Sequence, residues 1–533
     1  MHDAVASTVP IRRFSVVAAA RASIPTLAEA SLVIASALLL ILSFPDFELW
    51  PLAWIGLVPF LLVAGQPLPG GRAFVLGWLW GAIFFYGTCW WLTYPMIHYA
   101  QIPGWLAYLL LVLPIALVAI FTALFSVLLS RLVARFGLGA LLAAPPLWIA
   151  CEWLRYVVTD QLWNALGYSQ AFHYLLIQTA RWGGVYAVSF LIMSVNAAIA
   201  FALIRGTAKG LAVSLSFGFL VLVIMAASIL TGSSRPAESK EAGLAIVAVQ
   251  PNVPMEDSAD SEQLLRQHFE LSLQGLRTLS DAAAPVTLII WPESPMNFSY
   301  SRNPHLREVL SSFVRTNKQN QTFVLLNSLE PARDGGESNS ALLINEEGRI
   351  VAQYDKIRLM PFGEYVPLPH WLPGASSVRG VVGDFTPGSS YTLMPLGAFR
   401  AGVFICIEAA HPSVARRFAN ESADMLINIS NDGYLGPTPV RRQHLSNAIF
   451  RAVENGRHLV RVTNNGIGAD IESDGRVLDS TPASAPAVRT WRAGIGKESK
   501  TFYTRYGDLF AYACALISLG LVTTTFRTRS MRR

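Results

Sequence analysis

The stretch "AGVFICIE", residues 401–408, decides the fold of the C-terminal half of the chain and raises the question of its function. Its short apolar run, with β-branched and aromatic members, predicts a buried strand that ends at Cys406. A cysteine in such a place is most often an inert core residue, because free cysteine packs as a small hydrophobe. It can also be a nucleophile, and the rest of the chain has to separate these two interpretations.

The sequence around this stretch predicts strands that alternate with helices. "GLAIVAVQPNV" (243–253) and "APVTLIIWPES" (284–294) are β-branched runs that end in turn residues, as strands do. The segment between them has apolar residues at helical spacing, and so does "RQHLSNAIFRAVENGRHL" (442–459). "SALLINEEGRIVAQYDK" (340–356) contains a hairpin turn. Together these elements predict a layered α/β domain with a mixed sheet.

The composition places this domain in a membrane protein. Hydrophobic residues make up 53% of the 533 residues and charged residues only 14%, where a soluble protein usually carries about 25% charge. The apolar residues are unevenly spread, which predicts five parts. These are a cytoplasmic segment (1–23), a transmembrane block (24–231), a soluble domain (232–505), a last transmembrane helix (506–526) and a cytoplasmic tail (527–533).

Seven segments of the block are apolar enough to suggest crossings, since a span takes about 20 apolar residues. They are 24–44, 51–66, 73–96, 105–131, 138–157, 184–204 and 211–231. The first leads straight into the second without a clean cleavage site, so a removed signal peptide is the weaker interpretation.

The basic residues predict the orientation of these crossings. They precede the first segment, occupy alternate loops and end the chain: Arg12, Arg13, Arg21, Arg72, Arg131, Arg135, Arg205, Lys209, Arg527, Arg529, Arg532 and Arg533. Because Lys and Arg favour the cytoplasmic side, both termini are expected there and the soluble domain on the other side. These flanks largely account for the net charge of +6, so we do not expect nucleic-acid binding.

Three polar residues follow predicted strands of the soluble domain: Glu293, Lys356 and Cys406. A thiol needs a base or a nearby positive charge to act as a nucleophile at neutral pH. A glutamate can take its proton, and a lysine can stabilise the oxyanion that forms when the thiolate attacks a carbonyl. The backbone N–H of Ile407 can be a second oxyanion donor. This set is sufficient for acyl transfer, while each residue taken alone has an ordinary structural explanation.

Several motifs resemble those of known proteins. "WPES", "YDKIRLMPFGEYVP" and "CIE" resemble the Glu, Lys and Cys motifs of the nitrilase (carbon–nitrogen hydrolase) superfamily. "SFPDFELWPLAWIGLVPFLL", "LWNALGYSQ" and "GVYAVSFL" resemble the membrane segments of the apolipoprotein N-acyltransferase family, and "GDFTPG", "NISNDGYLG" and "VTNNGIGADIESDGR" resemble its soluble domain. The resemblance implies a polytopic α-helical membrane block joined to a nitrilase-like αββα sandwich.

The resemblance also implies roles for individual residues. Cys406 would be the nucleophile, Glu293 the general base, Lys356 the stabiliser of the tetrahedral intermediate, and Glu364 a second glutamate that supports Lys356. The chain departs from the family pattern at Ile407, where Tyr is usual, at Tyr434 in place of Trp, and at Leu162, where Pro is common. These departures put acyl-chain and headgroup preference in doubt.

The implied reaction is ping-pong and uses neither a metal nor an organic cofactor. The thiol takes an acyl chain from a phospholipid, and the α-amine of a diacylglyceryl-modified N-terminal cysteine of an apolipoprotein accepts it. The expected location is the bacterial inner membrane, with a monomeric enzyme whose catalytic domain is periplasmic. A membrane-anchored amidase that uses water as acceptor would share the triad, and a non-catalytic lipid-binding scaffold is a third interpretation.

A Gly- and Pro-rich segment (367–387) follows Glu364 and carries apolar residues, as active-site lids often do. Its members Trp371, Leu372 and Val381 are expected to contact the membrane interface and the lipid substrate, and Tyr434 to line the lipid path. His444 is interpreted as a core residue rather than a base.

Overall fold

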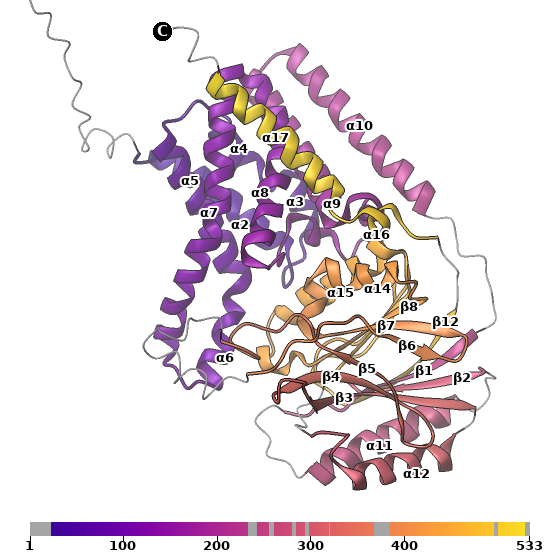
Figure 1. Ribbon diagram of the computed structural model, residues 1–533. Coiled ribbons are helices and arrows are strands. Elements are labelled where there is room, and N and C mark those ends of the chain that lie inside the picture. Colours follow the sequence, from indigo (N-terminus) through magenta and orange to yellow (C-terminus); the bar gives the residue numbers. More distant parts are fainter. Residues whose placement is uncertain are drawn as a thin grey trace, which may run out of the picture.

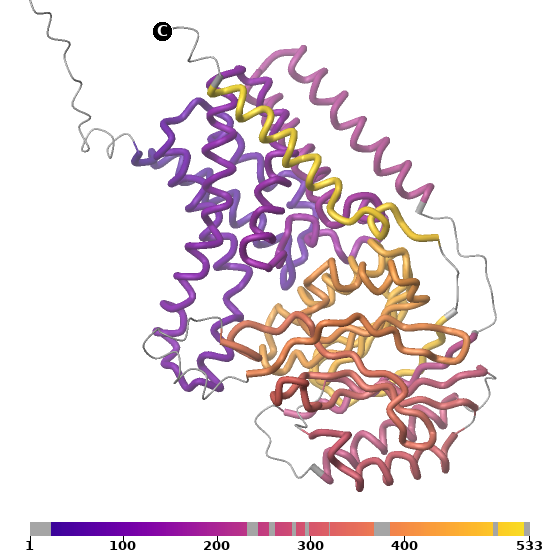
Figure 2. Tube along the Cα trace, viewed as in Figure 1, coloured from indigo at the N-terminus to yellow at the C-terminus, as the bar shows by residue number. Residues whose placement is uncertain are grey.

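The computed structural model describes residues 23–232, 242–254, 261–279, 284–293, 298–318, 320–366, 384–494 and 499–527. It consists of a helical block and an α/β sandwich (Figures 1 and 2). Trp371, Leu372 and Val381, together with most of the predicted lid, lie outside the described residues, as do the first 22 residues and the last six.

The helical block contains apolar helices at all the predicted segments. Its principal helices are α2 (Leu27–Ser43), α3 (Ala53–Gly56), α4 (Val58–Ala64), α5 (Gly70–Cys89), α6 (Thr93–His98), α7 (Gly104–Phe136), α8 (Ala144–Thr159), α9 (Ala180–Arg205), α10 (Ala208–Gly232) and α17 (Leu509–Arg527). Among the residues that the structure describes, six helical stretches are long and apolar enough to cross a membrane. The stretches Leu27–Ser43 and Trp50–Ala64 are shorter, so the prediction that they also cross stays a prediction.

The second of these shorter stretches is broken for a local reason. Prolines at residues 51 and 59 each stand in the first turn of a short helix, where the missing N–H of proline costs nothing. A continuous helix cannot run through such positions without losing backbone hydrogen bonds. The expected single segment is therefore divided into a 3-10 turn, α3 and α4.

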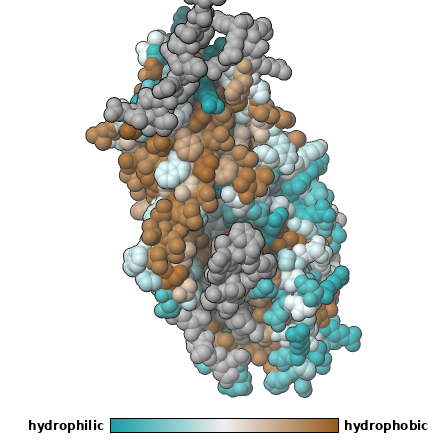
Figure 3. Space-filling model, turned by 60° about the vertical axis from the view of Figure 1, so that its left-hand side comes forward, coloured by the Kyte–Doolittle hydropathy of each residue, from teal (hydrophilic) through white to brown (hydrophobic). Residues whose placement is uncertain are grey.

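Helix α7 extends beyond the thickness of a bilayer. Its 33 residues correspond to about 50 Å at helical rise, against about 30 Å of hydrocarbon. Its N-terminal part lies with α6 beside the sandwich (Figure 1). Trp105 and Leu113 in this part are 72% and 68% exposed, and Figure 3 shows hydrophobic residues over the helical block and hydrophilic ones over much of the sandwich.

The sandwich contains two six-stranded sheets. The first has the order β12-β1-β2-β3-β4-β5 and the second β11-β10-β9-β8-β7-β6. The strands are β1 (Ala242–Gln250), β2 (Val286–Ile290), β3 (Gln321–Pro331), β4 (Glu337–Ile344), β5 (Ile350–Asp355), β6 (Leu393–Leu396), β7 (Phe399–Ile405), β8 (Met425–Ser430), β9 (Leu459–Thr463), β10 (Ala469–Ile471), β11 (Val477–Ser480) and β12 (Ala487–Gly494). The predicted mixed α/β architecture is confirmed.

Side-chain alternation along the strands builds the layers. In β1, Ile246 belongs to the core shared with the second sheet, while its neighbour Val247 belongs to a separate cluster with the outer helices. The helices α11 (Ser261–Thr278) and α12 (Pro304–Asn317) cover the first sheet, and α14 (Pro412–Asn420) and α15 (Val440–Asn455) cover the second (Figure 1). The result is the expected αββα sandwich.

Helix α15 joins the sandwich to the helical block through Gln443. Its Oε1 accepts hydrogen bonds from the indoles of Trp163 (2.7 Å) and Trp91 (3.1 Å). Its Nε2 donates to the carbonyls of Thr88 (3.0 Å) and Pro45 (3.2 Å). One buried amide thus binds four positions of the block, and every hydrogen-bonding group it has is used.

A buried ion pair on the same helix makes further contacts with the block. Arg451 and Glu454 are fully buried and lie 2.9 Å apart. Glu454 accepts a hydrogen bond from the Val185 N–H (3.0 Å), where α9 restarts after a break at Gly184, and Arg451 donates to the Tyr168 hydroxyl (3.1 Å). Buried charges are tolerated only when they are paired and hydrogen-bonded. Since Val185 and Tyr168 of the block supply hydrogen bonds to this pair, the contacts fix the sandwich against the block.

Candidate active site

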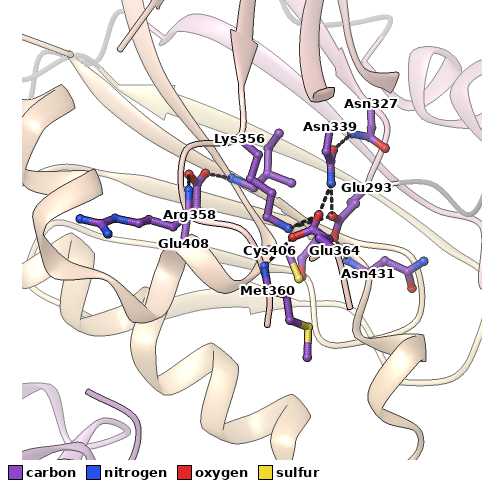
Figure 4. A network of polar contacts seen from close by, with 12 residues as sticks. Glu293, Asn327, Asn339, Lys356, Arg358, Met360, Glu364, Cys406, Glu408 and Asn431 are labelled. Atoms are coloured by element: carbon purple, nitrogen blue, oxygen red, sulfur yellow. Dashed lines mark hydrogen bonds and ion pairs between the residues drawn. The ribbon is translucent and has the colours of Figure 1, made fainter. Parts of the chain in front are cut away.

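The sheet topology explains why the predicted residues meet. In the first sheet β2 and β3 are parallel, and β5 shares their direction because two antiparallel pairings separate it from β3. Glu293 and Lys356, which follow β2 and β5, therefore lie at one edge. In the second sheet β7 and β8 are parallel, which puts Cys406 and Asn431 at the end of their strands. Figure 4 shows these residues converging.

Lys356 is almost completely buried between two carboxylates. Its Nζ lies 2.9 Å from Glu364 Oε1 and 3.3 Å from Glu293 Oε1. Burial by itself lowers the pKa of a lysine, but Glu293 and then Glu364 outweigh this effect and raise the pKa of Lys356 above its ordinary value. The side chain is therefore a fixed ammonium at neutral pH, suited to stabilising an oxyanion.

Asn339 contacts both carboxylates, which the sequence did not predict. It lies near the start of the antiparallel strand β4, at the same sheet edge, and its Nδ2 donates to Glu293 Oε1 (2.9 Å) and to Glu364 Oε1 (2.8 Å). Asn327 donates to Asn339 Oδ1 (2.6 Å), which fixes the orientation of the amide. One amide and one ammonium thus bridge the two carboxylates and keep them in place. A polar residue at the start of the apolar strand "SNSALLI" was the available signal.

Backbone groups hold the other oxygens of the two carboxylates. Glu293 Oε2 accepts from the Asn431 N–H (3.0 Å), and Glu364 Oε2 accepts from the Met360 N–H (2.8 Å). With the bridging groups, each carboxylate is fixed at both of its oxygens. Such fixed groups lose little free energy to reorganisation during a reaction.

Cys406 occupies a sharp turn between β7 and a 3-10 turn that begins at the cysteine itself. Its φ is +51°, a region that residues other than glycine rarely occupy. Burial, and then the Glu293 carboxylate, raise the pKa of the Cys406 thiol above its ordinary value, against the opposing effect of Lys356. The resting group is therefore a neutral thiol, which needs a base to remove its proton before it can act as a nucleophile.

Glu408 ties this turn to the segment that carries Lys356. It is fully buried, and its carboxylate accepts hydrogen bonds from the N–H groups of Ile405, Ile357 and Arg358 (2.8, 2.8 and 3.0 Å) and from the Tyr354 hydroxyl (2.8 Å). Three backbone N–H donors and the Tyr354 hydroxyl favour the ionised carboxylate, while burial raises the pKa of this group. Sequence reasoning did not assign this residue a role.

The carbonyl of Cys406 is held from the other side. His444 on α15 places Nε2 at 2.9 Å from this oxygen and Nδ1 at 2.9 Å from Asp432 Oδ1. Arg461 donates to both oxygens of Asp432 (2.9 and 2.8 Å). Burial raises the pKa of Asp432, but Arg461 and then His444 outweigh this effect and lower the pKa below its ordinary range. Asp432 is therefore a carboxylate.

The remaining predicted residues lie as follows. Ile407 is buried in the first turn after Cys406. Tyr434 stacks on Tyr99 of the helical block, with ring centroids 5.2 Å apart, and its hydroxyl lies 3.4 Å from the Phe362 carbonyl. Leu162 is buried at the junction of block and sandwich. Within the described part of the chain, no group of three or more His, Cys, Asp or Glu side chains is arranged to hold a metal ion.

Comparison with known proteins agrees with this architecture. Residues 36–198 match the family model of the apolipoprotein N-acyltransferase N-terminal domain, and residues 244–503 match that of carbon–nitrogen hydrolases. The Apolipoprotein N-acyltransferase of Geobacter metallireducens is 33% identical over 506 residues, which cover 93% of this chain and 95% of that one. The chain belongs to the apolipoprotein N-acyltransferase family. The resemblance seen in the sequence motifs is thereby confirmed.

A second relative and a solved structure complete the comparison. The Apolipoprotein N-acyltransferase of Allorhizobium ampelinum is 32% identical over 469 residues, 85% of each chain. A mutant amidase of the nitrilase superfamily from Nesterenkonia AN1 superposes with a TM-score of 0.37 at 16% identity, covering 51% of this chain and 97% of that one. The apolar helices and the family membership together support a membrane-embedded protein.

Proposed function

We propose that this protein transfers an acyl chain from a phospholipid, through a thioester on Cys406, to the α-amine of an apolipoprotein's N-terminal diacylglyceryl-cysteine. One observation carries the proposal: Glu293, Lys356 and Cys406 converge in a sandwich fixed to apolar helices. A nucleophile, a base and an ammonium make an acyl-transfer site. The attached helices bring that site to a lipid surface, and the family relatives carry the name of this activity.

In the first half-reaction the Cys406 sulfur attacks the ester carbonyl of the phospholipid while Glu293 takes the thiol proton. Lys356 and the Ile407 N–H stabilise the oxyanion of the tetrahedral intermediate. Collapse breaks the ester bond, and the leaving alkoxide takes the proton from Glu293. The products are a lysophospholipid and the thioester.

In the second half-reaction the lipoprotein amine attacks the thioester, and Glu293 receives one proton of that amine. Collapse breaks the C–S bond, and the proton passes to the departing thiolate. The amide is released and the thiol is restored. Glu364 holds Lys356 throughout, and the chemistry balances without a metal or an organic cofactor.

The proposed orientation places the sandwich on the periplasmic side of the bacterial inner membrane, with both chain ends in the cytoplasm. The basic residues of the flanks and alternate loops support it. The first described residues and the end of α17 also lie at the end of the block remote from the sandwich (Figure 1). One chain supplies every residue of the site, which favours a monomer as the working unit.

The first half-reaction is the step to test. Purified protein is incubated with phosphatidylethanolamine vesicles, and the acyl mass on the intact protein is measured and mapped. We expect the mass on Cys406, no adduct on the Cys406→Ala variant, and a strongly reduced amount on Lys356→Met. An acyl mass on Cys406→Ala, or none on the unmodified protein, contradicts the proposal. The amidase alternative predicts rapid loss of the acyl group to water.

A further inference from the structure

The carbonyl group of Cys406 is engaged by a side chain that the proposed reaction does not use. His444 is 2% exposed, and its Nε2 lies 2.9 Å from the Cys406 oxygen. A carbonyl oxygen can only accept, so Nε2 carries a proton, whether or not Nδ1 also carries one toward Asp432. Nδ1 faces Asp432 Oδ1 at 2.9 Å and an Arg461 guanidinium nitrogen at 3.2 Å. With both ring nitrogens engaged in this way, the ring is not placed to act as the base for the thiol.

This contact determines where the Ile407 N–H points. The Cys406 carbonyl and the Ile407 N–H belong to one peptide unit, which is planar and trans, so the two groups point in opposite directions. A ring that holds the carbonyl on one side therefore aims the N–H to the other. Ile407 lies in the first turn of a 3-10 helix, where N–H groups have no partner within the helix.

The backbone at this turn also needs support. Cys406 has a φ of +51°, and such conformations persist only where the surroundings impose them. His444 itself is held, because Asp432 lies 2.9 Å from Nδ1 and Arg461 binds both oxygens of Asp432. Helix α15 is fixed at the adjacent Gln443 by four hydrogen bonds to the helical block.

We infer that His444 is a positioning residue for acyl transfer: by holding the Cys406 carbonyl it aims the Ile407 N–H at the oxyanion of the tetrahedral intermediate. The inference rests on the proposed function, in which that N–H is an oxyanion donor. We therefore expect loss of His444 to slow acylation, which forms an oxyanion, and to have little effect on reactions of the thiol that form no oxyanion.

Two reactions of the same thiol separate these effects. Acylation is followed by the burst of nitrophenolate from p-nitrophenyl butyrate, a soluble donor that does not require lipid access. Alkylation is followed by the mass that iodoacetamide adds to Cys406. Both need the thiolate, but only acylation passes through a tetrahedral oxyanion. The full chain in detergent is used for the unmodified protein and each variant.

The variants are His444→Phe, which cannot donate to the carbonyl, and His444→Gln, whose amide can. His458→Phe is the matched control, because His458 forms a histidine–carboxylate pair with Asp470 on the same sheet and the structure gives it no bond to Cys406. Loss of one oxyanion donor costs roughly 100- to 1000-fold. For a misaimed donor we expect acylation by His444→Phe to fall about 10- to 100-fold.

The expected pattern is a fall in acylation with alkylation within about twofold of the unmodified protein, recovery of acylation in His444→Gln, and no change in His458→Phe. Equal losses in both reactions of His444→Phe, with no recovery in His444→Gln, would show that the ring supports the fold of the turn and would overturn the inference. Unchanged acylation in His444→Phe would overturn it as well. Burst acylation that survives in Cys406→Ala would instead refute the proposed function.

Discussion

Replacement of Glu408 by glutamine tests how the site is held together. The variant keeps the shape of the side chain but removes its charge and turns one acceptor oxygen into a donor. Three donors converge on Oε1 and one, the Ile405 N–H, on Oε2. The amide oxygen of glutamine will therefore occupy the Oε1 position, and its NH₂ group will face the N–H of Ile405.

The magnitude follows from counting these bonds. A hydrogen bond to a charged acceptor contributes about 1.5–3 kcal/mol and a neutral one about 0.5–1.5 kcal/mol, so each of three bonds weakens by about 1 kcal/mol. The unpaired Ile405 N–H costs about 1–3 kcal/mol more. These losses sum to about 4–6 kcal/mol. Against this, burial raises the pKa of Glu408, and the neutral amide avoids the desolvation cost of a buried charge, taken as about 3 kcal/mol. We expect a net loss of stability of about 1–3 kcal/mol.

The effect on catalysis should be larger than the effect on stability. Ile405 precedes the nucleophile, and the N–H groups of Ile357 and Arg358 follow Lys356 directly. Loosening both sides at once lets the ammonium and the sulfur drift apart, and a displacement of about 1 Å can cost about 100-fold in rate. We therefore expect acylation of Cys406 to fall about 100-fold in Glu408→Gln.

The assay pairs two measurements on purified protein in detergent. Acylation is measured as the rate at which the acyl mass appears, and stability as the midpoint of thermal unfolding. Glu421→Gln, at a partly exposed glutamate paired with Arg417 on the surface of the sandwich, is the matched control and should change neither. Acylation at the unmodified rate by a folded Glu408→Gln protein would refute the reasoning.

The remaining predictions concern chemistry, pH, topology and domain contact. Cys406→Ser should be close to inactive although it folds normally, because a hydroxyl is much harder to deprotonate than a thiol; transfer at a substantial rate, measured by mass spectrometry, would count against the assigned nucleophile. Burial and Glu293 raise the pKa of Cys406, while Lys356 opposes them, so the rate of iodoacetamide alkylation should keep rising with pH through the ordinary thiol range near pH 8.5. The pH–rate profile of Lys356→Met should lie at still higher pH. A plateau at neutral pH would contradict this. A reporter fused after Arg533 should be active only in the cytoplasm and one inserted in residues 331–339 only outside, and activity on the same side would show that the number of crossings is miscounted. Gln443→Leu leaves the Trp163 indole N–H and the Pro45 carbonyl without this partner, while the Trp91 indole still donates to the Thr88 carbonyl. We therefore expect a loss of about 1–3 kcal/mol and a lower thermal midpoint; an unchanged midpoint would mean that the sandwich is fixed elsewhere.

Parts of the site could be predicted because the ends of strands are recognisable in the sequence. Apolar β-branched runs stop at Glu293, Lys356 and Cys406. Strands that share a direction end at the same edge of their sheet, which places Glu293 and Lys356 together in the first sheet and Cys406 beside Asn431 in the second. Asn339 was not predicted because it lies near the beginning of β4, an antiparallel strand whose start lies at the edge of the first sheet where β2 and β5 end. Its position depends on strand order, and local sequence does not determine strand order.

The roles of Glu408 and His444 in the site were not predicted for a different reason. Both are buried polar residues that bond backbone groups of distant segments, among other partners, and a single sequence shows neither burial nor partners. The helical block was predictable in its apolar segments, and the breaks at Pro51 and Pro59 follow from the prolines themselves. Trp371 lies outside the described residues, so the proposed lid stays a prediction.

The most direct test of the account is a chase of the acylated enzyme. Protein that carries a labelled acyl chain on Cys406 is freed of phospholipid and mixed with a peptide whose N-terminal cysteine bears a diacylglyceryl group, with the same peptide blocked by N-acetylation, or with buffer alone. We expect the label to move to the free-amine peptide as an amide and to stay on Cys406 with the blocked peptide and with buffer. Rapid loss of the label to free fatty acid in all three mixtures would contradict it.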